Sequence, residues 1–98
     1  MRHFIVTLHF KVPFETFGET VQRHRAFLQE GYDLGLLLMS GPQNPRTGGI
    51  VVARAASLET LRAFFAGDPY RVEGLAEHAF TEFVPVKSQE LVKEWIGE

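Results

Sequence analysis

One histidine of this sequence stands where a helix would be expected to carry an apolar side chain. In the stretch VQRHRAFLQEG, residues 21–31, His24 falls on the same predicted helix face as Val21 and Leu28. A histidine on such a face is more often a packed core residue than a catalyst. Imidazole also gains and loses a proton near physiological pH, so His24 is the first candidate for acid–base chemistry.

A carboxylate that could work with His24 comes much later in the chain. Asp68 precedes Pro69 in the motif DPY, and an Asp-Pro pair is a common start of a helix, so N-capping alone would account for it. If Asp68 accepts a hydrogen bond from one ring nitrogen of His24, it fixes the tautomer and leaves the other nitrogen as a general base. Such a pair would suit proton abstraction beside a carbonyl, elimination or isomerisation.

Three further residues are candidates for substrate binding. Ser40 and Gly41 end a predicted strand, where they could present a hydroxyl and a backbone N–H to a substrate oxygen, although a plain turn explains them equally well. Tyr70 could line the pocket, or it could pack in the core beside Pro69.

The other histidines are weaker candidates for chemistry. His3, His9 and His78 lie on strands that the expected fold makes neighbours, so a metal cluster is conceivable. The ligand spacing of a motif such as H-E-x-x-H is missing, and we therefore favour surface or interface histidines and expect no metal. No Rossmann glycine pattern, P-loop or cofactor lysine motif is present, so we expect no cofactor.

The elements that must position these residues follow from the hydrophobic period. Apolar and polar residues alternate in strands, and apolar residues recur every three or four positions in helices. A serine caps the expected second helix and another caps the tail, at Ser57 and Ser88. The expected strands are 3–10, 36–42, 50–55 and 76–87, and the expected helical segments are 16–33, 58–67, 68–75 and 88–98.

The order strand, helix, strand, strand, helix, strand predicts an α+β, ferredoxin-like fold. Because βαβ connections are right-handed, the two units interleave into a four-stranded antiparallel sheet with both helices on one face. We expect one domain over residues 1–87 and a short helical extension over 88–98.

The predicted sheet leaves one face without a cover. The runs 36–39 and 50–53 are apolar on both sides of their strands, whereas two helices can cover only one face. A second copy of the chain is the simplest cover, so we expect a homodimer, with the tail around Trp95 across its interface.

Composition excludes several classes of partner. The net charge is −2, and the ten lysines and arginines are scattered, so we expect no nucleic-acid binding. The strand 50–55 also lacks the stacking aromatics of an RNA-binding sheet. Neither a signal sequence nor an apolar run of roughly 20 residues is present, so we expect no membrane association and a cytoplasmic protein without disulfides.

Several of these motifs occur together in a known family. HRAFLQEG, LLLMSGP and GGIVVARAASLETLRAFFAGDPY, followed by the last alternating strand, resemble the YCII-related (YciI-like) family over residues 3 to about 86. The resemblance implies the dimeric α/β-barrel variant of the ferredoxin-like fold and an active site made by His24 and Asp68. It also implies a fold shared with small lyases and isomerases of aromatic degradation.

Two functions of different classes remain open. The first is a cofactor-free enzyme of the lyase or isomerase type, in which His24 is the acid–base group and Asp68 orients it. The second is a non-catalytic module that binds a small ligand or assists assembly, in which His24 only hydrogen-bonds the ligand or a buried carbonyl. Haem ligation by a histidine, known in relatives of this fold, predicts a Soret band with haemin.

Overall fold

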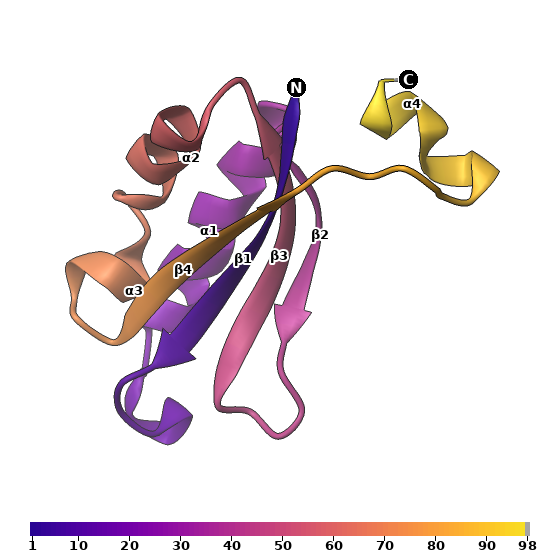
Figure 1. The fold of residues 1–98 in the computed structure, drawn as a ribbon. Coiled ribbons are helices and arrows are strands. Elements are labelled where there is room, and N and C mark those ends of the chain that lie inside the picture. Colours follow the sequence, from indigo (N-terminus) through magenta and orange to yellow (C-terminus); the bar gives the residue numbers. More distant parts are fainter. Residues whose placement is uncertain (98) are drawn as a thin grey trace.

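Four antiparallel strands form a single sheet, and three helices lie on one of its faces (Figure 1). The computed structural model describes residues 1–97. The strand order is β2-β3-β1-β4, which confirms the expected ferredoxin-like arrangement. The strands are β1 (Arg2–Phe10), β2 (Leu37–Pro42), β3 (Gly48–Ala55) and β4 (Ala76–Phe83). The helices are α1 (Thr20–Asp33), α2 (Leu58–Phe65), α3 (Pro69–Val72) and α4 (Lys93–Ile96), with short 3-10 turns at Phe14–Thr16 and Glu90–Val92.

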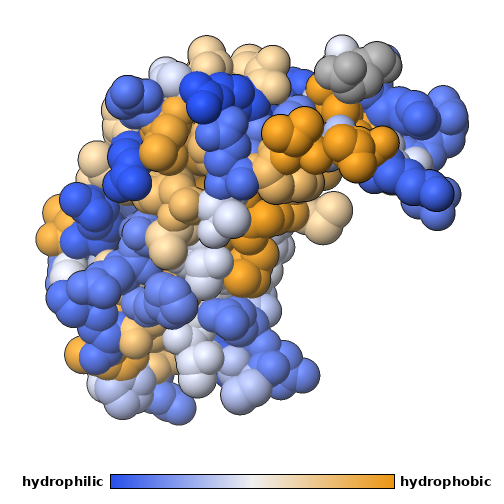
Figure 2. Space-filling model, in the orientation of Figure 1, coloured by the Kyte–Doolittle hydropathy of each residue, from blue (hydrophilic) through white to orange (hydrophobic). Residues whose placement is uncertain are grey.

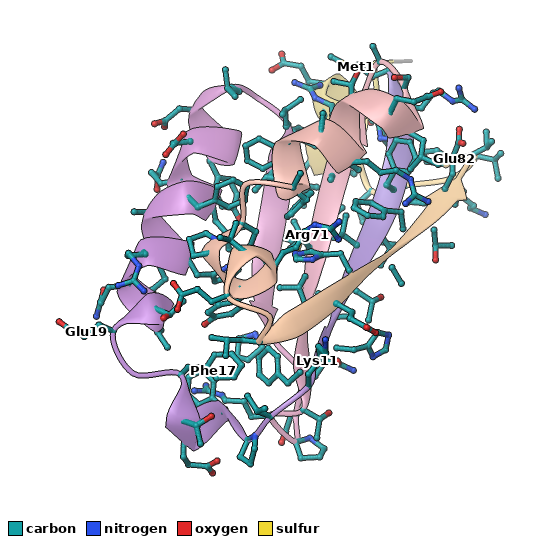
Figure 3. All side chains as sticks on the ribbon, turned by 90° about the vertical axis from the view of Figure 1, so that its left-hand side faces the viewer. Met1, Lys11, Phe17, Glu19, Arg71 and Glu82 are labelled. Carbon is teal, nitrogen blue, oxygen red and sulfur yellow. The ribbon has the colours of Figure 1, made fainter. Side chains whose placement is uncertain are left out.

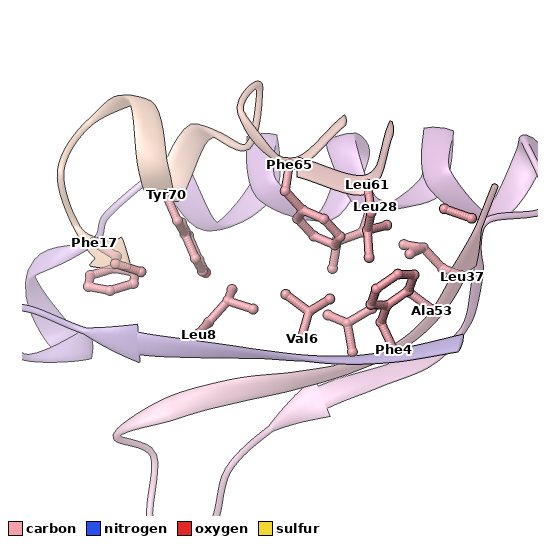
Figure 4. Close-up of a cluster of buried hydrophobic side chains, with 13 residues drawn as sticks. Phe4, Val6, Leu8, Phe17, Leu28, Leu37, Ala53, Leu61, Phe65 and Tyr70 are labelled. Atoms are coloured by element: carbon pink, nitrogen blue, oxygen red, sulfur yellow. The ribbon is translucent and has the colours of Figure 1, made fainter. Parts of the chain in front are cut away.

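Strand β1 is central and supplies the floor of the hydrophobic core. Its alternation sends Phe4, Val6 and Leu8 toward the helices, where all three are almost completely buried. Val6 pairs with Val51 of β3 on one side and with Phe80 of β4 on the other. The core therefore fills the layer between sheet and helices, as Figure 4 shows.

Helix α1 begins later than the apolar spacing predicts. Gly18 has a φ of +58°, a left-handed conformation that favours glycine, and it separates the first 3-10 turn from the helix. Phe17 is buried but precedes the helix. Gly31 lies inside α1 rather than after it. The position takes glycine because a Cβ there would come within 2.7 Å of the Leu37 and Phe64 side chains.

Helices α2 and α3 follow one another across the same face of the sheet (Figure 3). The Ser57 hydroxyl accepts the Thr60 N–H at 3.1 Å, so the predicted cap is confirmed. Leu61 and Phe65 of α2 are buried in the core. Helix α3 packs between α1 and β4, which places its first residues next to both.

The expectation for the C-terminal end of the chain was partly wrong. Strand β4 ends at Phe83, which pairs with His3 near the start of β1, and not at residue 87. Pro85 has no N–H to donate to a continued ladder. Ser88 is not a cap, since Gln89 and Val92 precede the two short helical turns without side-chain capping bonds. Residue 98, the last of the predicted extension, lies outside the described residues.

The C-terminal segment turns back over one end of the face that the helices leave open. The Arg54 guanidinium lies 3.9 Å from the centre of the Trp95 ring and donates to the Trp95 carbonyl at 2.9 Å. Ile5, Ile50 and Val52 on the same face are half-buried. Apolar side chains gather on the hollow side of the molecule below this segment, as Figure 2 shows. No helix within residues 1–97 has the length and apolar character needed to cross a bilayer.

Candidate active site

His24 lies on the face of α1 that packs against the sheet. It shares that face with Thr20, Leu28 and Gly31, all of them buried, and its side chain is 11% exposed. The helical period therefore places the imidazole in the core layer. The exposed fraction of the side chain shows that part of it still contacts solvent.

Asp68 is held in place by the start of α3. One of its carboxylate oxygens, Oδ1, accepts the Tyr70 N–H at 3.0 Å, and Pro69 occupies the first helical position, so the predicted N-cap is present. The residue is completely buried. A buried carboxylate is costly unless its oxygens are hydrogen-bonded, and capping alone would leave Oδ2 without a partner.

The predicted contact between His24 and Asp68 is present. His24 Nδ1 lies 2.7 Å from Asp68 Oδ1. An ionised carboxylate can only accept, so Nδ1 carries the proton and donates it, and the lone pair of a neutral His24 is then on Nε2. Nε2 makes no hydrogen bond within residues 1–97 and is not among the buried unpaired atoms, so it is open to the outside of the core.

A second histidine completes the arrangement, and we did not predict it from the sequence. His78 Nε2–H donates to Asp68 Oδ2 at 2.9 Å, and the His78 side chain is 1% exposed. The expectation of a surface or interface histidine was therefore wrong for His78. Its Nδ1 is buried without a partner in the part of the chain that the structure describes.

The pairing of β1 with β4 excludes the conceivable metal cluster of His78 with His3 and His9. His78 pairs with Leu8 on the helix side of the sheet, whereas His3 and His9 point to the opposite side. His3 is buried under the C-terminal segment, where its Nε2–H donates to the Ile96 carbonyl at 3.3 Å. Among the described residues no group of three potential ligands could hold a metal ion.

The Asp68 carboxylate is kept ionised by its neighbours. Burial pushes its pKa upward, but hydrogen bonds from His24 and His78, the positive charge of His24 when it is protonated, and the Tyr70 N–H together lower the pKa below its ordinary value. Asp68 thus accepts from both imidazoles as a carboxylate, and it can offset a positive charge that forms on His24 when Nε2 takes up a proton.

A pocket of about 240 Å³ opens between α1 and the sheet, beside the end of β2. His24 and Tyr70 line it, and so do Ser40 and Gly41, whereas Asp68 lies behind His24 and does not reach it. The structure therefore brings together around one cavity all the residues that we predicted as substrate-binding.

Two features of the pocket wall had no signal in the sequence. The Ser40 hydroxyl lies 2.7 Å from the Tyr32 hydroxyl, so Ser40 has a hydrogen-bond partner before any ligand binds. Gly49 of β3 occupies a position that faces the helices between Leu8 and Pro42, and the missing side chain leaves the cavity open there.

The comparisons with known proteins agree with this architecture. Residues 1–84 match the family model described as the YCII-related domain. No curated protein matches the chain. A solved structure of 5-chloro-2-hydroxyhydroquinone dehydrochlorinase (TftG) from Burkholderia phenoliruptrix AC1100, in complex with 2,5-dihydroxybenzoquinone, is similar, with a TM-score of 0.64 and 17% identity over 90% of this chain and 97% of that chain. At this identity the likeness shows a shared fold.

Proposed function

The chain belongs to the YCII-related family, and from this premise we propose that it is an enzyme in which His24 is the general base and Asp68 orients it. One observation carries the proposal: His24 Nδ1 is bonded to a buried carboxylate at 2.7 Å, while the other ring nitrogen is unpaired on a residue that lines a pocket. This is the arrangement that a general base requires, because the proton-accepting atom faces the substrate and the opposite atom is fixed.

The reaction class that fits is proton abstraction followed by elimination or isomerisation. Nε2 of His24 takes a proton from a hydroxyl, or from a carbon beside a carbonyl. The electron pair of the broken bond forms a new double bond, and either a leaving group departs with its own bonding pair or the pair shifts within the substrate. Asp68 stabilises the resulting imidazolium. The step is a proton transfer without net oxidation, so it requires no electron acceptor.

The similar structure suggests the first substrate to test. Its name describes a dehydrochlorinase of a chlorinated hydroxyhydroquinone, and loss of HCl from such a ring is an elimination of the proposed class. The pocket of about 240 Å³ has room for a molecule of one ring. For this chain the substrate is a proposal, because the likeness shows the fold alone.

The test compares the chain with its His24→Asn variant. The Asn side-chain N–H replaces the Nδ1–H that Asp68 accepts, while the proton-accepting Nε2 is lost. With 5-chloro-2-hydroxyhydroquinone, and with a panel of compounds that carry an acidic hydrogen beside a carbonyl, we expect chloride release or deuterium incorporation by NMR. The rate should fall by about 10²–10⁴-fold in the variant.

Two outcomes would contradict the enzymatic role. An unchanged rate in His24→Asn would remove His24 as the base. Tight binding of 2,5-dihydroxybenzoquinone without turnover of any compound in the panel would favour the non-catalytic ligand-binding module instead.

We also propose that the open face of the sheet pairs with that of a second copy. Ile5, Ile50 and Val52 are only half-buried there, and the C-terminal segment covers one end of the face within its own chain. Light scattering at micromolar concentration should give the mass of a dimer, and Val52→Glu should give a monomer. A monomeric mass for the unchanged protein would contradict this proposal.

A further inference from the structure

Among the residues that the structure describes, the pocket is lined by two positively charged side chains and by no negatively charged one. Arg25 of α1 and Arg46 of the loop between β2 and β3 both line it. No aspartate or glutamate is among its lining residues in the described part of the chain, since Asp68 is shielded behind His24. The protein as a whole carries a net charge of −2, so the positive charge at the pocket is opposite in sign to the net charge of the protein.

These two guanidinium groups also differ from others in the molecule. Arg2 and Arg23 are bonded to Glu82 and Glu73. Across residues 1–97, the guanidinium groups of Arg25 and Arg46 make neither a salt bridge nor a hydrogen bond, and that of Arg46 lies 4.7 Å from the centre of the Phe14 ring. Two exposed guanidinium groups at one pocket mouth are therefore available to a ligand.

The electrostatic influence of both arginines extends to Tyr70, which lines the same pocket. Burial raises the pKa of Tyr70, as does the negative charge of Asp68, whereas Arg25 and Arg46 act in the opposite direction. Tyr70 packs directly on the His24 ring, so an anion held by the two arginines would lie close to the proposed base.

The rest of the lining is apolar and leaves room for a small ring. Leu8, Phe10, Val21, Leu28 and Val51 line the cavity, whose volume is about 240 Å³. A bare inorganic anion would leave these walls unfilled, whereas an organic anion would cover them and bury apolar surface.

We infer that the pocket selects a small organic anion, a single-ring carboxylate or enolate. Arg25 and Arg46 hold its charged group at the mouth, and its apolar body lies against His24. This inference rests on the proposed function, since it names the class of substrate for the same site.

The experiment uses benzoate and benzamide, which have nearly the same shape and differ in charge. Binding is followed by NMR on the ring C–H signals of His24 in the whole chain, with inorganic phosphate as a third probe. We expect benzoate to bind more tightly than benzamide or phosphate. The Arg25→Gln/Arg46→Gln double variant should weaken benzoate binding at least tenfold and leave benzamide binding unchanged.

The Arg62→Gln/Arg71→Gln double variant is the matched control, because it also removes two positive charges, from exposed residues of α2 and α3 that do not line the pocket. It should leave benzoate binding unchanged. Equal binding of benzoate and benzamide, or an equal loss in the control, would overturn the inference. Phosphate binding as tight as that of benzoate would also overturn it, because the apolar walls would then contribute nothing.

Failure of the inference and failure of the proposed function can be separated. Arginine-dependent benzoate binding without any turnover would support the inference and contradict the enzymatic role. Turnover of neutral compounds at rates that neither arginine affects would support the enzymatic role and contradict the inference.

Discussion

The imidazole ring of His24 lies flat on the phenol ring of Tyr70, with the ring centres 3.7 Å apart and the planes within 5° of parallel. Tyr70 is itself held edge-on by Phe10 and Phe17 and is 4% exposed. Asp68 fixes which nitrogen of His24 carries the proton, and Tyr70 fixes the plane in which the ring lies. The two constraints come from the same helix start, because Asp68 is the N-cap of α3 and its carboxylate accepts the Tyr70 N–H.

The stacked ring predicts different results for two substitutions of Tyr70. Tyr70→Phe keeps the ring, so the free energy of unfolding should change by less than about 1.5 kcal/mol. Tyr70→Leu removes the stack and leaves space in the core, so it should cost about 2–4 kcal/mol and lower the rate more than Tyr70→Phe does. Urea unfolding and the rate assay check both. Equal rates in the two variants would show that the stack does not position His24.

His78 predicts a role for the second oxygen of Asp68. His78→Leu removes the donor to Oδ2, so the pKa of Asp68 should rise and the acid limb of the rate profile should move to higher pH. His78→Gln retains an N–H near the position of Nε2 and should restore most of the rate. In His78→Leu, the loss of this hydrogen bond to a charged group should lower the free energy of unfolding by about 1.5–3 kcal/mol. If both variants lose stability but keep the wild-type pH profile, His78 is structural only.

The lowered pKa of Asp68 predicts how stability depends on acid. Burial opposes the shift, but the bonds from His24 and His78 outweigh it, so the folded state binds the proton of Asp68 less tightly than the unfolded state. The resulting stability is present above the unfolded pKa of about 3.9 and is lost as pH falls through the lower folded value. Asp68→Asn should therefore cost about 2–3 kcal/mol at neutral pH, and the difference from the unchanged protein should narrow below pH of about 4.

The control for this prediction is Asp33→Asn, which changes an exposed carboxylate on α1. Urea unfolding at several pH values gives the free energies. A constant difference between the unchanged protein and Asp68→Asn at all pH values would contradict the account of the Asp68 environment.

A larger side chain at Gly49 should fill the pocket without unfolding the protein. A Cβ at this position would lie 3.4 Å from the Gly41 carbonyl oxygen and 4.0 Å from Leu8 Cβ, which are tolerable contacts. Valine suits a strand, so Gly49→Val should keep the stability within about 1 kcal/mol. It should weaken ligand binding at least tenfold (about 1.4 kcal/mol) because its methyl groups occupy the cavity. Undiminished binding would show that ligands do not use this part of the pocket.

The fold could be predicted from the sequence because its apolar residues recur regularly along the strands and helices. Alternation identified β1, and the helical spacing identified α1 together with the inward position of His24. Asp68 could be placed because Asp-Pro is a local signal for a helix start. The distance between His24 and Asp68 could not be derived locally, since it depends on how α1 and α3 pack. The motif resemblance raised that expectation, and the family match confirms the resemblance.

His78 was missed although a signal was present. It alternates with Ala76 and Phe80, and Ala76 is buried, so the rule that placed His24 on an inner face applied to His78 as well. The contact between Tyr32 and Ser40 and the gap at Gly49 had no comparable signal. Both depend on the register of β2 against β3 and on the irregularity between Leu37 and Met39, which hydropathy does not determine.

The complete enclosure of Asp68 ties the His24–Asp68 pair to the cooperativity of folding. Its donors come from α1, from the first turn of α3 and from β4, so opening any one of these segments breaks a hydrogen bond to the buried carboxylate. The amide proton of Tyr70, held on Asp68, should then exchange with deuterated solvent only through global unfolding. The protection factor of this amide therefore reports, without any activity assay, whether the proposed active site is intact. The loss of this protection on heating should share one midpoint with the loss of compactness.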